Sequence, residues 1–514
     1  MDEGNTNSVV PVMENVPPAP GPAEPAPGAP ETLVIPVSPQ PEAGPPLAEA
    51  SPPSAENQFA PQIIPAQAPP AAAGTPPGSN PMPKRLLMIV VFIVLLLGLG
   101  LLGRFVYGLL AGAKEVTIIY WGLWENDALI RPVIADFESS HPKIKVQYVK
   151  QSHKQYRERL QAAVARGDGP DVFRFHNTWV AMLANDLSPV PKTVMTAAEF
   201  AQAFYPVAVA DLVGGQSIYG IPLMIDGLGL YYNEDLLASA GVVPPTTWEE
   251  MLNIVPKLTV KTDATITTSA IALGTTGNVE NFSDILALMM MQNGANLREP
   301  TSQEAEETLI FYRKFADAAD PVYTWNETLD NSIYAFAMGK VAMILAPSWR
   351  AFDVRQINPN LRFKIAPVPQ LPGNTVSWAS YWVEGVSGKS KYQEQAWEFV
   401  KYLTGKEAAT KLYTEASKTR LFGEPYARVE LGSGLASDPY VGAFIKQAAN
   451  SKSFPLASRT FDNGINDKLI KYMEDAVNGM IAGSSPKAVL TTAASGFRQV
   501  LGSYGLSSGA APAR

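Results

Sequence analysis

Between residues 115 and 505, short apolar runs alternate with longer segments in which apolar residues recur at helical spacing. The short runs predict β-strands, and they read VTIIYWG, IKVQYV, DVFRFH, AIALGT, VAMILAP and FKIAPVP. The longer segments predict helices, and they read ALIRPVIADFESSH, KQYRERLQAAVARG, TWEEMLNIVPKL, SQEAEETLIFYRKFADAA, YQEQAWEFVKYLTG and INDKLIKYMEDAVNGMIAG. This alternation indicates an α/β fold with mostly parallel sheets. The segment is too long for one ordinary sheet, so we expect two lobes.

A different pattern precedes this region, because residues 86–103 form an uninterrupted apolar stretch. Its ~18 residues would make a helix of roughly 27 Å, which is enough to cross the apolar core of a bilayer. Lys84 and Arg85 place the N-terminus on the cytoplasmic side, although Arg104 and Lys114 weaken that asymmetry. We therefore predict a single-pass transmembrane anchor over residues 84–113, with the binding region outside the cell membrane.

A cleaved signal peptide is the alternative, because AGA at residues 111–113 fits a small-x-small cleavage site. The long apolar core and the long leader before it favour the retained anchor. The preceding LAGA resembles a lipoprotein cleavage box, but Ala113 stands where that box requires cysteine, which excludes lipid attachment at this position.

Both ends of the chain have the composition of unfolded segments. Residues 1–83 are rich in proline and alanine and contain no Lys or Arg. Such a segment buries too little apolar surface to offset the entropy lost on ordering, so we predict a disordered cytoplasmic tail. Two interpretations stay open: a spacer or docking arm with polyproline segments, and a tail under little constraint. Residues 506–514 predict a flexible C-terminus.

Composition narrows the chemistry. The chain has no cysteine, which excludes disulfides, thiol nucleophiles and cysteine-ligated zinc. Its histidines, His141, His153 and His176, lack metal-ligand spacing, so we expect neither a metal site nor a cofactor. The net charge of −8 argues against a nucleic-acid partner. No Walker loop, GxGxxG, HExxH or GxSxG motif occurs between a strand and a helix.

Aromatic residues with polar neighbours recur after the predicted strands. In open parallel sheets, ligands bind beyond the carboxyl ends of strands. Aromatic faces can stack on the C–H faces of a sugar, while nearby polar groups bond its hydroxyls. Any single tryptophan is more often core than site, but four recurrences favour a carbohydrate site. The groups are Trp124 with Glu125; His176, Asn177 and Trp179; Ser348, Trp349 and Arg350; and Trp378, Tyr381 and Trp382.

Residues 218–250 contain several glycines and prolines in an extended apolar run, as expected where a chain crosses between lobes. Asp226 interrupts that run, and a carboxylate there needs a partner or a ligand. The alternative is a bend that Asp226 caps. PPTTWEE then begins a helix with a capping box formed by Thr246 and Glu249 or by Thr247 and Glu250, and Trp248 fits packing better than ligand contact.

The ordered segments together resemble the family-1 extracellular solute-binding proteins, the sugar-binding components of ABC importers, of which maltose-binding protein is a member. The resemblance covers about residues 116–505. Its most diagnostic pieces are GDGPDV and YYNEDLL followed by PPTTWEEM. Other pieces are VTIIYWGLWE, VIADFESSHPKIKVQYV, YAFAMGKVAMILAPSW, FKIAPVPQLPG and SKYQEQAWEFVKYLTGKEAATKLY.

The resemblance implies a two-lobe periplasmic-binding-protein-like α/β fold, with ligand in the cleft and a hinge that closes around it. Its crossings lie near residues 226–230 and 366–369. Lobe 1 would comprise residues 115–228 and 366–422, and lobe 2 residues 229–365 and 423–505. Carried over by position, the ligand-binding candidates are Trp124, Glu125, His176, Asn177, Asp226 and Trp349. Tyr381, Trp382 and Arg420 are further candidates, from a segment that departs from the family pattern.

We therefore expect a membrane-anchored receptor, not an enzyme, that captures a mono- or oligosaccharide and delivers it to an ABC transporter permease. A glycan-cleaving enzyme is a second hypothesis, with Glu125, Asp226 and Glu384 as candidate carboxylates, but no motif fixes their separation. A third hypothesis is a ligand-sensing or adhesive ectodomain that is not coupled to transport.

Overall fold

The computed structural model describes residues 88–89, 92–100, 114–263 and 265–506. Residues 88–89 and 92–100 are helical. Within these ranges, no helix has both the length and the apolar character that crossing a membrane requires. The predicted anchor, residues 84–113, extends over positions outside the described residues. The predicted disordered tail and residues 507–514 also lie outside them.

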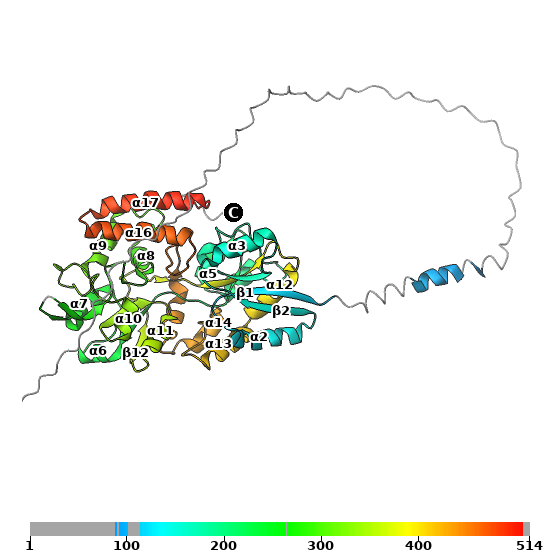
Figure 1. The fold of residues 1–514 in the computed structure, drawn as a ribbon, viewed down its shortest axis with the longest axis horizontal. Coiled ribbons are helices and arrows are strands. Elements are labelled where there is room, and N and C mark those ends of the chain that lie inside the picture. Colours follow the sequence, from blue (N-terminus) through cyan, green and yellow to red (C-terminus); the bar gives the residue numbers. More distant parts are fainter. Residues whose placement is uncertain (1–87, 90–91, 101–113, 264, 507–514) are drawn as a thin grey trace, which may run out of the picture. The chain divides into compact units, whose positions relative to one another are not determined.

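The first of two large sheets has the strand order β2-β1-β3-β14-β4, and β7 also pairs with β14. β1 runs parallel to β2 and β3, whereas β14 runs antiparallel to β3, β4 and β7. Helices α2 and α12 pack on this sheet, and α13 packs on α2 (Figure 1). The strands are β1 (Val116–Gly122), β2 (Ile144–Lys150), β3 (Val172–His176), β4 (Leu187–Ser188), β7 (Ile221–Pro222) and β14 (Trp382–Ser387).

The second sheet has the order β12-β8-β11-β10-β9, and all its strands come from one continuous stretch. β11 is buried at every position, which explains its unbroken apolar sequence. Helices α7 and α10 pack on β10 and β11. The strands are β8 (Gly229–Asn233), β9 (Val260–Thr262), β10 (Thr265–Ile271), β11 (Val341–Ala346) and β12 (Phe363–Ala366).

The remaining elements surround these sheets and join them. The helices are α2 (Asp127–Ser140), α3 (Tyr156–Arg166), α4 (Ala197–Ala203), α5 (Pro206–Leu212), α6 (Glu234–Ser239), α7 (Trp248–Leu258), α8 (Phe282–Gln292), α9 (Gln303–Lys314), α10 (Ser332–Ala337), α11 (Arg350–Ile357), α12 (Gln393–Leu403), α13 (Lys406–Ser417), α14 (Val429–Gly432), α15 (Gly442–Gln447), α16 (Ile465–Ile481) and α17 (Pro486–Ser503). Shorter elements are η1 (Asn177–Trp179), η2 (Ser433–Leu435), η3 (Ala448–Asn450), β5 (Val213–Gly214), β6 (Ser217–Ile218), β13 (Ser377–Trp378) and β15 (Ser451–Lys452).

The expectation of mostly parallel sheets is wrong for both sheets. In the first sheet β1 makes the two parallel pairs and β14 makes three antiparallel ones. In the second sheet the only parallel pair among the described residues is β10 with β11, and β8 runs antiparallel to both β11 and β12. The reason is that β8 and β14 enter their sheets from the opposite lobe. Two consecutive strands can be parallel only if a connection, usually a helix, carries the chain back to the end of the sheet where the first strand began. A strand that arrives from the other lobe has no such connection, so it can run antiparallel to its neighbours.

Three backbone passages join the sheets. Residues 223–228 lead from β7 to β8, and residues 367–381 lead from β12 back to β14. The third passage contains β15, which pairs in parallel with β13. Gly227 forms a β-bridge with Ala379, so the first two passages are in direct backbone contact. We call these joined passages the hinge.

A local sequence signal explains where helix α7 begins. At α7, the capping box is made by Thr247 and Glu250 and not by Thr246 and Glu249. Trp248 at the first turn is buried and donates its indole N–H to Gln292 over 2.7 Å, so it packs within the second lobe.

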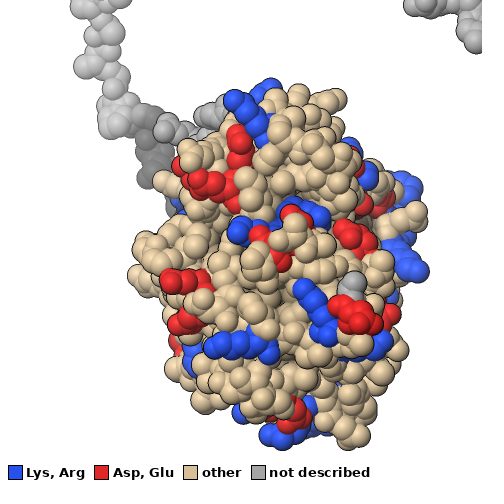
Figure 2. Space-filling view, turned by 90° about the vertical axis from the view of Figure 1, so that its left-hand side faces the viewer, with Lys and Arg blue, Asp and Glu red and all other residues tan. Residues whose placement is uncertain are grey.

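On the face drawn in Figure 2, acidic and basic side chains are interspersed and do not gather into a patch of one sign.

The two hinge passages approach each other closely at Gly227, so we predict that Gly227→Ala strongly lowers the stability of the protein. An added Cβ would overlap the backbone carbonyl oxygen of Trp378, so the passages must separate. We expect the free energy of unfolding in urea to fall by about 3 kcal/mol. Gly434→Ala is the matched control, because a Cβ at Gly434 meets no heavy atom within 4 Å. Equal effects of the two substitutions would contradict the close-contact account.

Candidate functional site

A cavity of about 470 Å³ lies between the two sheets, and residues of both lobes and of the hinge line it. We call it the cleft cavity. Among the nine residues predicted from the sequence, those that line it are Trp124, His176, Asp226, Trp349, Tyr381, Trp382 and Arg420. They come from the end of β1, the end of β3, the crossing before β8, the loop after β11, the start of β14 and the segment after α13. The strand-end rule therefore accounts for Trp124, His176 and Trp349, and the other lining residues come from crossings, strand starts and helix ends.

Aromatic side chains form one continuous part of the wall. Trp382 contacts Trp124 edge-to-face with ring centroids 5.4 Å apart, and it contacts His176 at 5.2 Å. Trp349 lies after β11, in the other lobe. Trp124 and Trp349 each keep 37% of their surface exposed, so part of each indole remains available to a ligand.

Glu125 does not line the cleft cavity, because its carboxylate is bound by Arg174. The Arg174 guanidinium lies 2.8 and 2.7 Å from the two Glu125 oxygens, and its Nη2 lies 2.6 Å from Glu384. All three side chains are nearly inaccessible to solvent. The structure thus places two of the three carboxylates considered for glycan cleavage in an internal ion cluster. Attraction to Arg174 lowers the pKa of Glu125 even though burial opposes it.

Asn177 also lies behind the wall. Its Nδ2 donates to Asp211 over 2.8 Å, and its Oδ1 accepts from the Tyr381 backbone N–H over 3.1 Å. The Tyr381 hydroxyl donates to the same Asp211 carboxylate over 2.8 Å. Asn177 therefore supports the backbone of the cavity-lining Tyr381 from behind.

Asp226 occupies the crossing and binds the loop after β11. Its carboxylate accepts hydrogen bonds from the Gly227 N–H at 2.8 Å, the Ser348 N–H at 3.1 Å and the Ser348 hydroxyl at 2.9 Å. Burial raises the pKa of Asp226 to about 7 in spite of these donors. Burial lowers the pKa of His176 to about 3, so its ring is neutral at physiological pH.

The arginines that line the cavity are already paired with carboxylates. Arg350 lies 2.6 Å from Glu280 and 2.7 Å from Asp353. Arg420 lies 2.7 Å from Glu424, and Arg459 pairs with the same Glu280 that Arg350 binds. No group of His, Asp and Glu among the described residues has the arrangement of a metal site.

The sequence reasoning missed the loop of residues 458–461, which lines the cavity. Arg459 and Phe461 have φ values of 62° and 50°, and Asn463 just after them has φ 43°. Such backbone is costly for residues other than glycine and is concentrated at functional sites. Phe461 packs on His153 with centroids 4.8 Å apart. The only sequence signal was the turn-forming pair Asn463–Gly464, which says nothing about what the turn faces.

Asn281 and Asp284 at the start of α8 are further lining residues that the sequence did not single out. Asp284 accepts from the Trp378 indole N–H over 2.8 Å and from the Ser458 backbone N–H over 3.1 Å. Four buried polar atoms around the cavity have no hydrogen-bond partner among the described residues: Asn281 Oδ1, Thr460 Oγ1, Arg350 Nε and Arg420 Nε. Because each of these atoms is buried, a ligand can bond it only where the surrounding side chains move.

The sequence also matches known proteins. A family model described as bacterial extracellular solute-binding protein matches residues 123–410. The chain is 26% identical over 319 residues to a multiple sugar-binding protein of Streptococcus mutans, which covers 58% of this chain and 73% of that protein.

Two solved structures are similar in fold. One is the sugar-binding protein MalE from Xanthomonas citri, with TM-score 0.62 and 21% identity, covering 76% of this chain and 98% of that one. The other is a cyclo/maltodextrin-binding protein complexed with maltotetraose, with TM-score 0.61 and 20% identity, covering the same shares of 76% and 98%.

The Arg174 cluster predicts a large loss of stability for Arg174→Met. The substitution leaves Glu125 and Glu384 buried without their cation, so we expect the free energy of unfolding to fall by about 3–5 kcal/mol. Arg131→Met is the control, since Arg131 and Asp127 form an exposed pair worth at most about 1 kcal/mol. Adding Glu125→Gln and Glu384→Gln to Arg174→Met should restore part of the loss. A single-variant loss no larger than that of Arg131→Met would contradict the prediction.

Asp226 predicts a pH dependence of stability. With a folded pKa of about 7 and an unfolded pKa near ~3.9, the folded state binds more protons between these values. The contribution of Asp226 to stability is therefore greatest below about pH 4 and falls as the pH rises to about 7. Urea unfolding of wild type and of Asp226→Asn at pH 5 and pH 8 measures how much the free energy of unfolding of each changes with pH. Wild type should lose more stability over this range, and parallel losses would exclude Asp226 as the source.

Proposed function

The chain belongs to the bacterial extracellular solute-binding protein family, whose members bind solutes and are not enzymes, and we propose that its solute is a neutral carbohydrate. In this proposal the sugar binds in the cleft cavity and is handed to the permease of an ABC transporter. The name of the Streptococcus mutans relative supports a sugar, but the proposal depends mainly on the cavity itself.

The observation that carries the proposal is the combination of exposed indole faces with charges that are already paired. Trp124 and Trp349 offer half-exposed rings from the two lobes, and Trp382 extends the first of these surfaces. Such faces suit the C–H surfaces of a pyranose ring. An anionic ligand would need an arginine without a partner, whereas Arg350, Arg420 and Arg459 each bind a carboxylate.

Hydrogen bonding and size agree with a small saccharide. Once the surrounding side chains move on binding, the buried and unsatisfied Asn281 and Thr460 oxygens can accept from sugar hydroxyls, and the Nε atoms of Arg350 and Arg420 can donate to them. A cavity of about 470 Å³ lies within the usual range of ligand pockets, ~300–1,000 Å³. Of the predicted contacts, Trp124, His176, Asp226, Trp349, Tyr381, Trp382 and Arg420 are retained here as proposed ligand contacts. Glu125 and Asn177 act behind them.

Closure about the hinge would couple sugar capture to delivery. The sugar stabilises the closed arrangement only by binding it more tightly than the open one, so contacts from both lobes are required. Trp124 and Trp349 meet that requirement because they belong to opposite lobes. The permease would then recognise the closed arrangement.

We also propose that residues 86–103 anchor this receptor in the cell membrane, with residues 1–83 on the cytoplasmic side. The support is the uninterrupted apolar sequence, which is long enough to span a bilayer. Such an anchor would keep the binding domain close to its permease, in the role that a lipid performs for relatives with a cysteine at the cleavage box.

The carbohydrate proposal is tested by calorimetric titration of the purified protein with mono- and oligosaccharides, and with amino acids and a polyamine for comparison. We expect heat from at least one saccharide, and Trp349→Ala should raise its Kd by about tenfold through lost stacking. Tyr392→Ala is the control, because Tyr392 is comparably exposed but does not line the cavity. Binding of an amino acid or of the polyamine without any response to sugars would overturn the proposal.

A further inference from the structure

A second cavity of about 650 Å³ lies at the hinge. It is lined by three segments, residues 206–211, 291–298 and 449–454, and by Thr375. We call it the hinge groove. No residue lines both the hinge groove and the cleft cavity, so the two spaces are separate.

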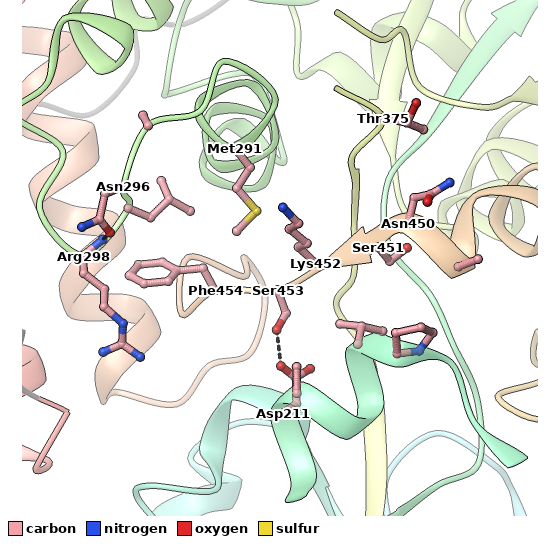
Figure 3. A pocket seen from close by; sticks show the side chains of 16 residues that line it. Asp211, Met291, Asn296, Arg298, Thr375, Asn450, Ser451, Lys452, Ser453 and Phe454 are labelled. Carbon is pink, nitrogen blue, oxygen red and sulfur yellow. Dashed lines mark hydrogen bonds between the residues drawn. The ribbon is translucent and has the colours of Figure 1, made fainter. Parts of the chain in front are cut away.

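The hinge groove is formed by parts that belong to different lobes. Figure 3 shows α5 of the first lobe on one side, α8 of the second lobe on the other, and β15 between them. A molecule bound there would touch both lobes and the third hinge passage. Its position is therefore one where a bound molecule can influence the angle between the lobes.

A single hydrogen-bonded wall separates the groove from the cleft cavity. Asp211 lines the groove, and Tyr381 lines the cleft cavity. The Tyr381 hydroxyl donates to the Asp211 carboxylate over 2.8 Å. Asn177 and Ser453 donate to the same carboxylate, so its oxygens are already occupied by three donors. Asp211 therefore has little capacity left to bind a cation in the groove.

Two positively charged side chains line the groove without an acidic partner. Lys452 extends from β15 toward Met291 of α8, and Arg298 lies beside Phe454 (Figure 3). Within residues 114–263 and 265–506, neither Lys452 nor Arg298 forms an ion pair, although Arg298 donates to the Leu506 carbonyl over 3.0 Å. Asn296 and Asn450 add amide groups to the same lining. The groove is thus suited to a negative charge.

The rest of the lining combines the polar residues Thr375, Ser451 and Ser453 with apolar side chains. Met291 and Leu297 come from one lobe, Val207 comes from the other, and Phe454 comes from the hinge passage. An inorganic anion would leave this surface without a partner, whereas an organic anion can cover it. The lining therefore indicates a molecule with one charged end and one apolar end.

We propose that the hinge groove binds a small organic carboxylate, with its charge beside Lys452 and its apolar part against Phe454 and Met291. Arg298 supplies a second positive charge to the same space. The groove is a site for an effector that acts at the hinge, distinct from the cavity proposed for the transported solute. The hinge groove can bind the carboxylate whether or not the cleft cavity takes a sugar, although occupancy of one cavity can change the affinity of the other through the hinge.

The test compares two probes of the same shape on the full chain. Phenylacetate carries the charge and the apolar ring, and phenylacetamide carries the ring without the charge. Dissociation constants are measured by ligand-observed NMR for wild type, Lys452→Ala and Lys446→Ala. Lys446 is exposed and lies outside the groove, so its variant matches the change in net charge.

For wild type we expect phenylacetate to bind about tenfold more tightly than phenylacetamide, because a charge-assisted contact to Lys452 is available only to the carboxylate. Lys452→Ala should remove most of this preference, and Lys446→Ala should retain it. Absence of phenylacetate binding, equal binding of the two probes to wild type, or a preference that survives Lys452→Ala would each overturn the proposal.

Discussion

The buried guanidinium of Arg174 is the constraint on which the first lobe depends. A cation without solvent access must be matched by anions, and here Glu125 supplies one from the end of β1 and Glu384 another from β14. Three segments distant in sequence are thereby held at fixed separation. Because Glu125 follows Trp124 directly, the same ion cluster sets where that indole lies at the mouth of the cleft cavity. A charge cluster inside the lobe thus determines the aromatic surface outside it.

The hinge is built on the same principle, with buried carboxylates that hold neighbouring passages together. Asp226 binds the Ser348 loop of the second lobe on the side of the cleft cavity. Asp211 binds Tyr381 and Ser453 on the side of the hinge groove. Between these carboxylates runs the short segment of residues 380–381. Any change in the angle between the lobes must therefore rearrange hydrogen bonds that face both cavities, which links events on one side of the hinge to the other.

The two cavities differ in whether their positively charged side chains have acidic partners. In the cleft cavity Arg350, Arg420 and Arg459 each already have a carboxylate, and what remains for a ligand is mainly aromatic surface. In the hinge groove the carboxylate is occupied by neutral donors, and two cations have no acidic partner among the described residues. A neutral polyhydroxylated solute and an organic anion are the ligands that these two environments respectively favour.

The sequence by itself predicted many of the elements, because periodic apolar runs and the PPTTWEE cap are local signals that need no distant partner. Its ordered segments also resembled the family that the comparison shows. It also located Trp124, His176 and Trp349, since a strand end carries its loop to the ligand edge of the sheet whatever the rest of the chain does. It could not determine the roles of Glu125 and Asn177, because their partners Arg174 and Asp211 lie 49 and 34 residues away. Nor could it find the 458–461 loop or the hinge groove. Those sites exist only where separate lobes meet, and the folded chain alone decides which side chains share that space.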